Sequence, residues 1–197
     1  MAVLLGVLWP LEKVNTLVLS VGRIIAILAL AIMVMLILGQ VFWRYVLDAA
    51  PNWTEEAARF GMLWMTGLMA PMAYRMGGFV AIDMLERALP RFVAGTLTLI
   101  LLTISLLVLV LAWDKGLNNH VDSLSGRGAS ASLRLPLDWF GGERVKFKNA
   151  WQYASLLVGI TLLISVNIEL ILRQIITLLG SGDRLHHLDG SDMVGAD

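Results

Sequence analysis

Long apolar runs without a single charge dominate this chain, and their lengths predict where it crosses a membrane. Crossing a hydrocarbon core of about 30 Å takes roughly 20 residues of α-helix at about 1.5 Å per residue. Three uncharged runs meet this requirement: residues 24–43, 92–113 and 149–168. A fourth, residues 60–74, has 15 residues and becomes long enough when the helix begins near Trp53.

In lipid, every backbone N–H and C=O group has to be bonded within the protein, so a span is either a helix or part of a closed barrel. The continuous leucine and isoleucine runs lack the alternation of barrel strands. The sequence therefore predicts an all-α integral membrane protein with one membrane domain, residues 1–179. Its four transmembrane helices are expected at about residues 24–46, 54–76, 92–113 and 149–172.

The segments outside the spans differ in character. Residues 1–11 are apolar without a basic start or a cleavage site, so we expect an N-terminal interfacial helix instead of a signal peptide. Residues 79–89 after the second span predict a short interfacial helix. The long connection 114–148 holds several glycines and most of the loop charge and is expected to be irregular and exposed, and the polar tail 180–197 to be flexible.

Tryptophans stand at the predicted helix ends, namely at positions 43, 53, 113 and 151. Indole rings favour the headgroup boundary of a bilayer. These residues are therefore interpreted as marks of the two water interfaces, with the filling of packing gaps as the alternative.

Composition supports a membrane protein and excludes other classes. The chain is 58% hydrophobic and 15% charged, with a mean hydropathy of +0.77, whereas soluble domains are about 25% charged. Membrane lipid is thus one expected partner. Fifteen basic and fifteen acidic residues cancel, so there is no basic excess to bind nucleic acid. The chain has no cysteine, which excludes disulfides and thiolate metal sites.

Residues for catalysis or cofactor binding do not stand out. The three histidines lie outside the predicted spans, where they cannot serve as axial ligands to a haem between helices. His186 and His187 in the tail are interpreted as solvated instead of metal-binding. Zinc spacings, phosphate-binding glycine loops and serine elbows are missing from the sequence. We therefore expect no enzyme activity, no cofactor and no metal site.

Charged residues gather at the ends of the spans. Glu55 and Arg59 are four residues apart, which predicts an ion pair along one helix face, while Glu56 points elsewhere. Glu169 and Arg173 repeat this spacing. Each pair either stabilises its own helix or locks onto a partner, and for Glu169 with Arg173 the first interpretation is favoured.

Small residues four apart predict close helix contacts, and they occur as Gly22 with Ala26, Ala57 with Gly61 and Ser155 with Gly159. Basic residues do not settle the orientation. Seven lie on the side of the termini and eight on the other.

The second span carries a recognisable motif. It opens with Trp-Thr-Glu-Glu-Ala-Ala-Arg at residues 53–59 and ends with Arg-Met-Gly-Gly-Phe-Val-Ala-Ile-Asp at residues 75–83. This resembles the small membrane subunit of tripartite ATP-independent periplasmic (TRAP) transporters. Phe79 stands where that family usually has histidine. The residues that match the family pattern are Glu55, Glu56, Arg59, Arg75, Gly77 and Asp83.

The resemblance implies a multi-pass protein of the bacterial inner membrane with both termini in the cytoplasm. Its partners would be a large multi-span subunit that moves an organic acid with sodium ions and a periplasmic substrate-binding protein. The matching residues become candidates for subunit contact or structure. On this topology the connection 114–148 faces the periplasm, and Arg127 and Arg134 become candidates for docking the binding protein.

Two other functions remain open at this point. The chain is alternatively a membrane anchor or assembly subunit of another complex, or a membrane enzyme. Co-purification with a large multi-span protein and a periplasmic binder distinguishes the first alternative from a TRAP subunit.

Overall fold

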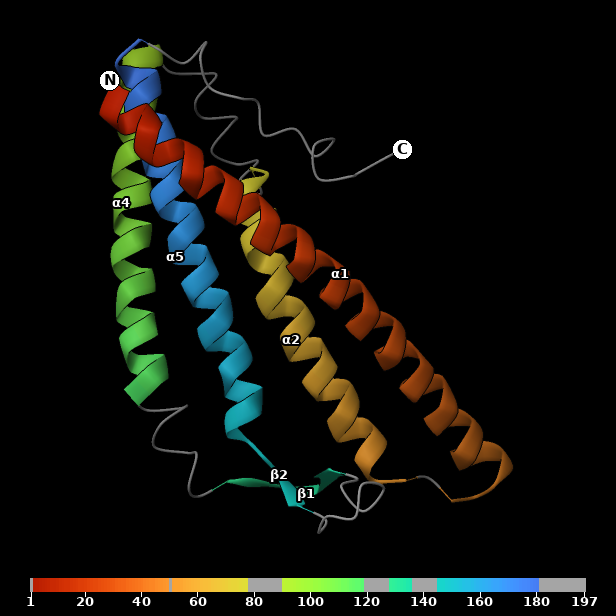
Figure 1. The fold of residues 1–197 in the computed structure, drawn as a ribbon. Coiled ribbons are helices and arrows are strands. Elements are labelled where there is room, and N and C mark those ends of the chain that lie inside the picture. The colour runs from red at the N-terminus through yellow and green to blue at the C-terminus, as the bar shows by residue number, and fades with distance from the viewer. Residues whose placement is uncertain (1, 50, 78–89, 119–127, 136–144, 181–197) are drawn as a thin grey trace, which may run out of the picture.

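A computed structural model describes residues 2–49, 51–77, 90–118, 128–135 and 145–180. These form four long helices and one small sheet (Figure 1). The elements, in chain order, are α1 (Ala2–Val46), α2 (Trp53–Arg75), α4 (Arg91–Lys115), β1 (Ala129–Leu135), β2 (Val145–Lys148) and α5 (Ala150–Leu178). The predicted all-α membrane fold is therefore confirmed as a class.

The N-terminal segment and the first span form one helix. α1 is 45 residues long and contains Pro10. The sequence predicted a separate interfacial helix before a span beginning at residue 24, but the structure has no break between the two. The predicted interfacial helix at residues 79–89 and the tail after Gly180 lie outside the described residues.

Three described helices are long and apolar enough to cross a membrane: Gly6–Val46, Phe92–Asn118 and Ala150–Leu178. They correspond to the first, third and fourth predicted spans. α2 has 23 residues and charged residues near both ends, which shorten its apolar stretch. It packs beside α1 and α5, and its assignment as a fourth span stays a prediction.

The helices follow one another in space in the order α1, α2, α5, α4, so that α5 lies beside α4 and α2 (Figure 1). A small apolar core joins the first three of these helices. Leu19 of α1, Met72 of α2 and Val166 of α5 are buried together. Most other large apolar side chains point outward, as expected for a protein whose solvent is lipid.

The long connection contains regular structure that the sequence analysis did not predict. β1 and β2 pair antiparallel, with Leu135 opposite Val145 and an irregularity between Ala129 and Arg134. Alternation in Val-Lys-Phe-Lys is typical of a strand with one apolar face. Phe147 packs edge-on against Phe60 of α2, with ring centroids 5.0 Å apart, and this contact attaches the sheet to the helices.

The tryptophans expected at helix ends lie there. Trp53 begins α2, Trp151 is the second residue of α5, and Trp43 and Trp113 fall in the last turns of α1 and α4. The indole N–H of Trp113 donates to Thr161 Oγ1 at 3.1 Å. Trp113 thus joins α4 to α5 from its position at a helix end.

Candidate functional site

A charged residue lies completely buried where α2 ends against α5. The carboxylate of Glu169 has a relative exposure of 0%. Burying an isolated carboxylate is strongly unfavourable, so a buried one needs charged or hydrogen-bonding partners. Arg75, the last residue of α2, donates to Glu169 Oε1 from Nε at 3.1 Å and from Nη2 at 2.7 Å. Helices far apart in sequence are therefore joined by a buried ion pair.

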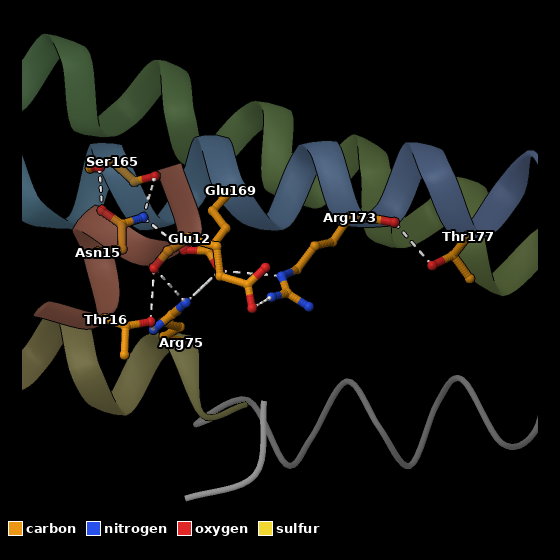
Figure 2. A network of polar contacts seen from close by, with 8 residues as sticks. All are labelled: Glu12, Asn15, Thr16, Arg75, Ser165, Glu169, Arg173 and Thr177. Carbon is orange, nitrogen blue, oxygen red and sulfur yellow. Dashed lines mark hydrogen bonds and ion pairs between the residues drawn. The ribbon is translucent and has the colours of Figure 1, made fainter. Parts of the chain in front are cut away.

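Arg173 extends this pair into a network of alternating charge. It lies one turn after Glu169 on α5 and donates from Nε to Glu169 Oε1 at 3.2 Å. Its Nη2 lies 3.0 Å from Oε1 of Glu12 on α1. Two carboxylates and two guanidinium groups from three helices thus give a net charge of zero (Figure 2).

Neutral side chains complete the network from α1. Asn15 donates from Nδ2 to Glu169 Oε2 at 2.7 Å and accepts at Oδ1 from the hydroxyl of Ser165 at 2.6 Å. Thr16 Oγ1 accepts from Arg75 Nη1 at 2.8 Å and donates to the carbonyl of Glu12 at 2.8 Å. Both oxygens of Glu169 therefore accept hydrogen bonds, which is the condition under which a buried charge is tolerated.

The network is set deep in the packing of the helices (Figure 2). Asn15, Arg75 and Arg173 are also buried. Beside it, Asn167 donates from Nδ2 to the hydroxyl of Tyr74 at 2.6 Å. Removing one member of a buried ion pair typically costs about 3–5 kcal/mol. Such an arrangement fixes the helices relative to one another.

A second contact joins α2 and α5 nearer their middles, through glycine. A Cβ on Gly159 would lie 2.8 Å from the carbonyl oxygen of Gly67, and one on Gly67 would lie 2.6 Å from that of Ser155. The two backbones therefore touch. Small residues permit such an approach, as predicted for Ser155 with Gly159. Gly61 similarly lies near the carbonyl oxygen of Ala29 on α1.

The predicted ion pair on α2 is present but lies elsewhere. Arg59 Nη2 is 3.1 Å from Glu55 Oε1, and both side chains are largely exposed. Glu56 accepts a hydrogen bond from the hydroxyl of Ser130 in β1. This end of α2 therefore contacts the sheet, far along the helix from Arg75.

The other candidate residues from the sequence analysis are not shown in the network. Gly77 has φ of +79°, where glycine is favoured, and its N–H donates to the carbonyl of Tyr74 at 3.3 Å. Arg134 lies in β1 opposite Lys146. Asp83 and Arg127 lie outside the described residues. Of the candidates for subunit contact or structure that the structure describes, Arg75 joins the network.

Sequence reasoning assigned Glu169 and Arg173 to local stabilisation of one helix, and this was incomplete. The structure adds Arg75 and Glu12 from other helices. A signal was present in three polar residues of a largely apolar segment, Glu12, Asn15 and Thr16. Their spacing places them on one helix face, together with Leu8 and Leu19 in the structure.

The network consists of ion pairs and hydrogen bonds between side chains. Its polar groups contact one another, and among the described residues no group of three or more His, Cys, Asp or Glu side chains is placed to hold a metal ion. What the arrangement does chemically is neutralise charge between helices. It is therefore suited to a structural function.

Comparison with known protein families identifies a match. The family described as Tripartite ATP-independent periplasmic transporters, DctQ component, matches residues 33–142, which is more than half of the chain. No curated protein and no solved structure matches.

Proposed function

This chain belongs to the DctQ component family of tripartite ATP-independent periplasmic transporters, and we propose that it is the accessory scaffold subunit of such a transporter. In this proposal it stabilises a large multi-span subunit that imports an organic acid, dicarboxylate-like in chemistry, together with sodium ions. A periplasmic binding protein delivers the substrate. The chain is a multi-pass protein of the bacterial inner membrane, with both termini in the cytoplasm.

The observation that supports a scaffold is the buried network around Glu169. Three helices contribute charges that neutralise one another, so α1, α2 and α5 cannot separate without exposing an unpaired charge to an apolar medium. The glycine contact of α2 with α5 adds a second fixed point. A subunit held in this way supplies an immobile surface against which a moving partner works.

The outer surfaces of the helices favour a partner or lipid over water. Residues on α1 and α4 such as Met35, Phe92 and Leu107 are more than half exposed. Transport sites typically use broken helices and polar groups near the bilayer midplane. The described helices α1, α2, α4 and α5 run without a break, and this supports the assignment of transport to the large subunit.

A reconstitution experiment tests the proposal. Liposomes carrying the large subunit with this chain, supplied with the binding protein and a sodium gradient, should accumulate substrate. Liposomes carrying this chain alone should accumulate none. Accumulation by the isolated chain, or full activity of the large subunit without it, would reject the accessory function.

The docking of the binding protein is proposed for the connection 114–148. This segment carries six basic and four acidic residues, a net charge of +2 that favours an acidic surface. Steering of this kind weakens with salt. Neutralising Arg127 and Arg134 together should slow association at low ionic strength and leave assembly with the large subunit unchanged.

The docking proposal has two contradicting outcomes. An association rate that is insensitive to both salt and these substitutions removes the connection from the docking surface. A cysteine at Ser125 that reacts with an impermeant label only from the cytoplasmic side contradicts the topology itself.

A further inference from the structure

The first third of α1 directs its polar residues inward, with the exception of the exposed Lys13, and its apolar residues outward. Glu12, Asn15 and Thr16 face the network, together with buried Leu8 and Leu19. The opposite face is exposed and apolar: Val7, Val14, Leu17, Val18 and Val21. A helix lying in water shows the reverse arrangement. The surroundings of this segment are therefore apolar.

This apolar exterior continues without interruption along α1. From Val14 to Phe42, every position that is exposed carries an apolar residue. The polar residues in this interval are all buried or half-buried, and they are Asn15, Thr16, Ser20, Arg23 and Gln40. Arg23 has an interaction partner within the chain, in keeping with the pairing of charges at membrane depth.

Both ends of the apolar face carry residues typical of a headgroup boundary. Trp9 is 68% exposed, and the ammonium of Lys13 lies 5.4 Å from the centre of its ring. At the other end are Trp43, Arg44 and Tyr45. Amphipathic aromatic rings and long basic side chains favour this boundary. Lys13 is the one charged residue between Trp9 and Trp43 that is exposed.

The length of this face implies a tilt. Residues 14–42 cover about 42 Å of helix axis, compared with a hydrocarbon core of about 30 Å. A helix of this length fits within the core when it is tilted by about 45°, beyond the usual average of about 20°. Figure 1 shows α1 crossing α5 obliquely. The uncharged part of α4, residues 92–113, covers about 32 Å and fits the same core with a tilt of about 20°.

We propose that α1 is one steeply tilted membrane helix whose outward face at Val14, Leu17 and Val21 contacts lipid acyl chains. The segment is then neither an arm in the cytoplasm nor a helix lying flat on the membrane surface. This position places the network of Glu12, Arg75, Glu169 and Arg173 beneath the headgroups. Its exact neutrality in charge is what the low dielectric there requires.

Spin labels test the position of α1, because the chain has no native cysteine. Single cysteines replace Leu17 and Val21, whose exposed side chains make labelling harmless to packing. Ile32 on the same helix is the lipid reference, and Lys115, the last residue of α4, is the boundary reference. The labelled full-length chain is placed in vesicles of phosphatidylethanolamine and phosphatidylglycerol, and collision rates with oxygen and with a soluble nickel complex are measured.

We expect oxygen to collide more often than nickel at positions 17 and 21, as at position 32, with the reverse at position 115. Nickel collisions in excess at position 17 would place the segment in water and overturn the proposal. Low collision rates for both reagents with an immobilised label would mean that protein covers this face, which also overturns it. The measurement needs no partner subunit, so its outcome is independent of the scaffold proposal.

Discussion

Substitution of Glu169 by glutamine removes the charge at the centre of the network and preserves the shape of the side chain. Glu169 accepts four hydrogen bonds of 2.7–3.2 Å from Arg75, Arg173 and Asn15. Without that charge, Arg75 loses its carboxylate partner and retains hydrogen bonds to neutral oxygens, among them the hydroxyl of Thr16 at 2.8 Å and the carbonyl of Glu12 at 3.4 Å. The network then contains two guanidinium charges and one carboxylate, that of Glu12, which lies 3.0 Å from Nη2 of Arg173.

Loss of one partner from a buried ion pair costs about 3–5 kcal/mol. That lowers the ratio of folded to unfolded protein by about 100- to 4,000-fold. For a chain of this size we expect the melting temperature to fall by about 6–20 °C. The assay is thermal denaturation of the purified chain in lipid nanodiscs, followed by tryptophan fluorescence.

Two further variants make this test specific. Glu55→Gln breaks an exposed pair of the same i, i+4 type and should cost about 0.2–1 kcal/mol. Arg75→Met combined with Glu169→Gln leaves Arg173 paired with Glu12, so the double variant should recover part of the loss through a coupling of about 0.5–3 kcal/mol. The reasoning is refuted when Glu169→Gln melts within a degree or two of Glu55→Gln, or when the double variant is destabilised by the sum of the two single changes.

Three other substitutions probe separate contacts. Gly159→Val places side-chain atoms against the backbone of Gly67 and should lower the free energy of unfolding by about 1–3 kcal/mol. The control is Gly6→Val, because nothing lies within 4 Å of a Cβ added there. Equal melting temperatures of the two variants would contradict the close contact. Ser130→Ala removes the hydroxyl that binds Glu56, so hydrogen exchange should accelerate in β1 and β2, and unchanged exchange would show that the bond does not hold the sheet. Arg59→Glu reverses the charge beside Glu55 and should reduce recovery of the large subunit with this chain, whereas unchanged recovery and uptake would remove the pair from the subunit interface.

The helices could be predicted because the thickness of the hydrocarbon core sets the number of consecutive uncharged residues that a spanning helix needs. The sequence did not predict that α1 is one continuous helix, since Glu12, Lys13 and Arg23 interrupt its apolar run. A charge in a sequence indicates a span end unless the partner that neutralises it is known. Here the structure supplies a partner for Glu12 from α5.

The network illustrates the same limit for the site. Glu169 with Arg173 was visible as an i, i+4 pair, and Arg75 as part of a family motif. Their connection depends on how α2 ends against α5, which involves residues 94 positions apart. Likewise, the strand alternation at Val145–Lys148 is too short to identify a sheet until Phe147 is seen packed against Phe60. Local patterns predicted the elements, and tertiary contacts decided which polar residues act together.

Uptake in cells tests the scaffold function and its dependence on the network most directly. Cells carry the large subunit and the binding protein with wild-type chain, with Glu169→Gln, or with Arg75→Met and Glu169→Gln together, and both organic-acid uptake and the large subunit recovered with this chain are measured. We predict that Glu169→Gln lowers both quantities in parallel and that the double variant regains part of both. Full uptake and recovery with Glu169→Gln, at wild-type abundance of the chain, would contradict a scaffold held together by this network.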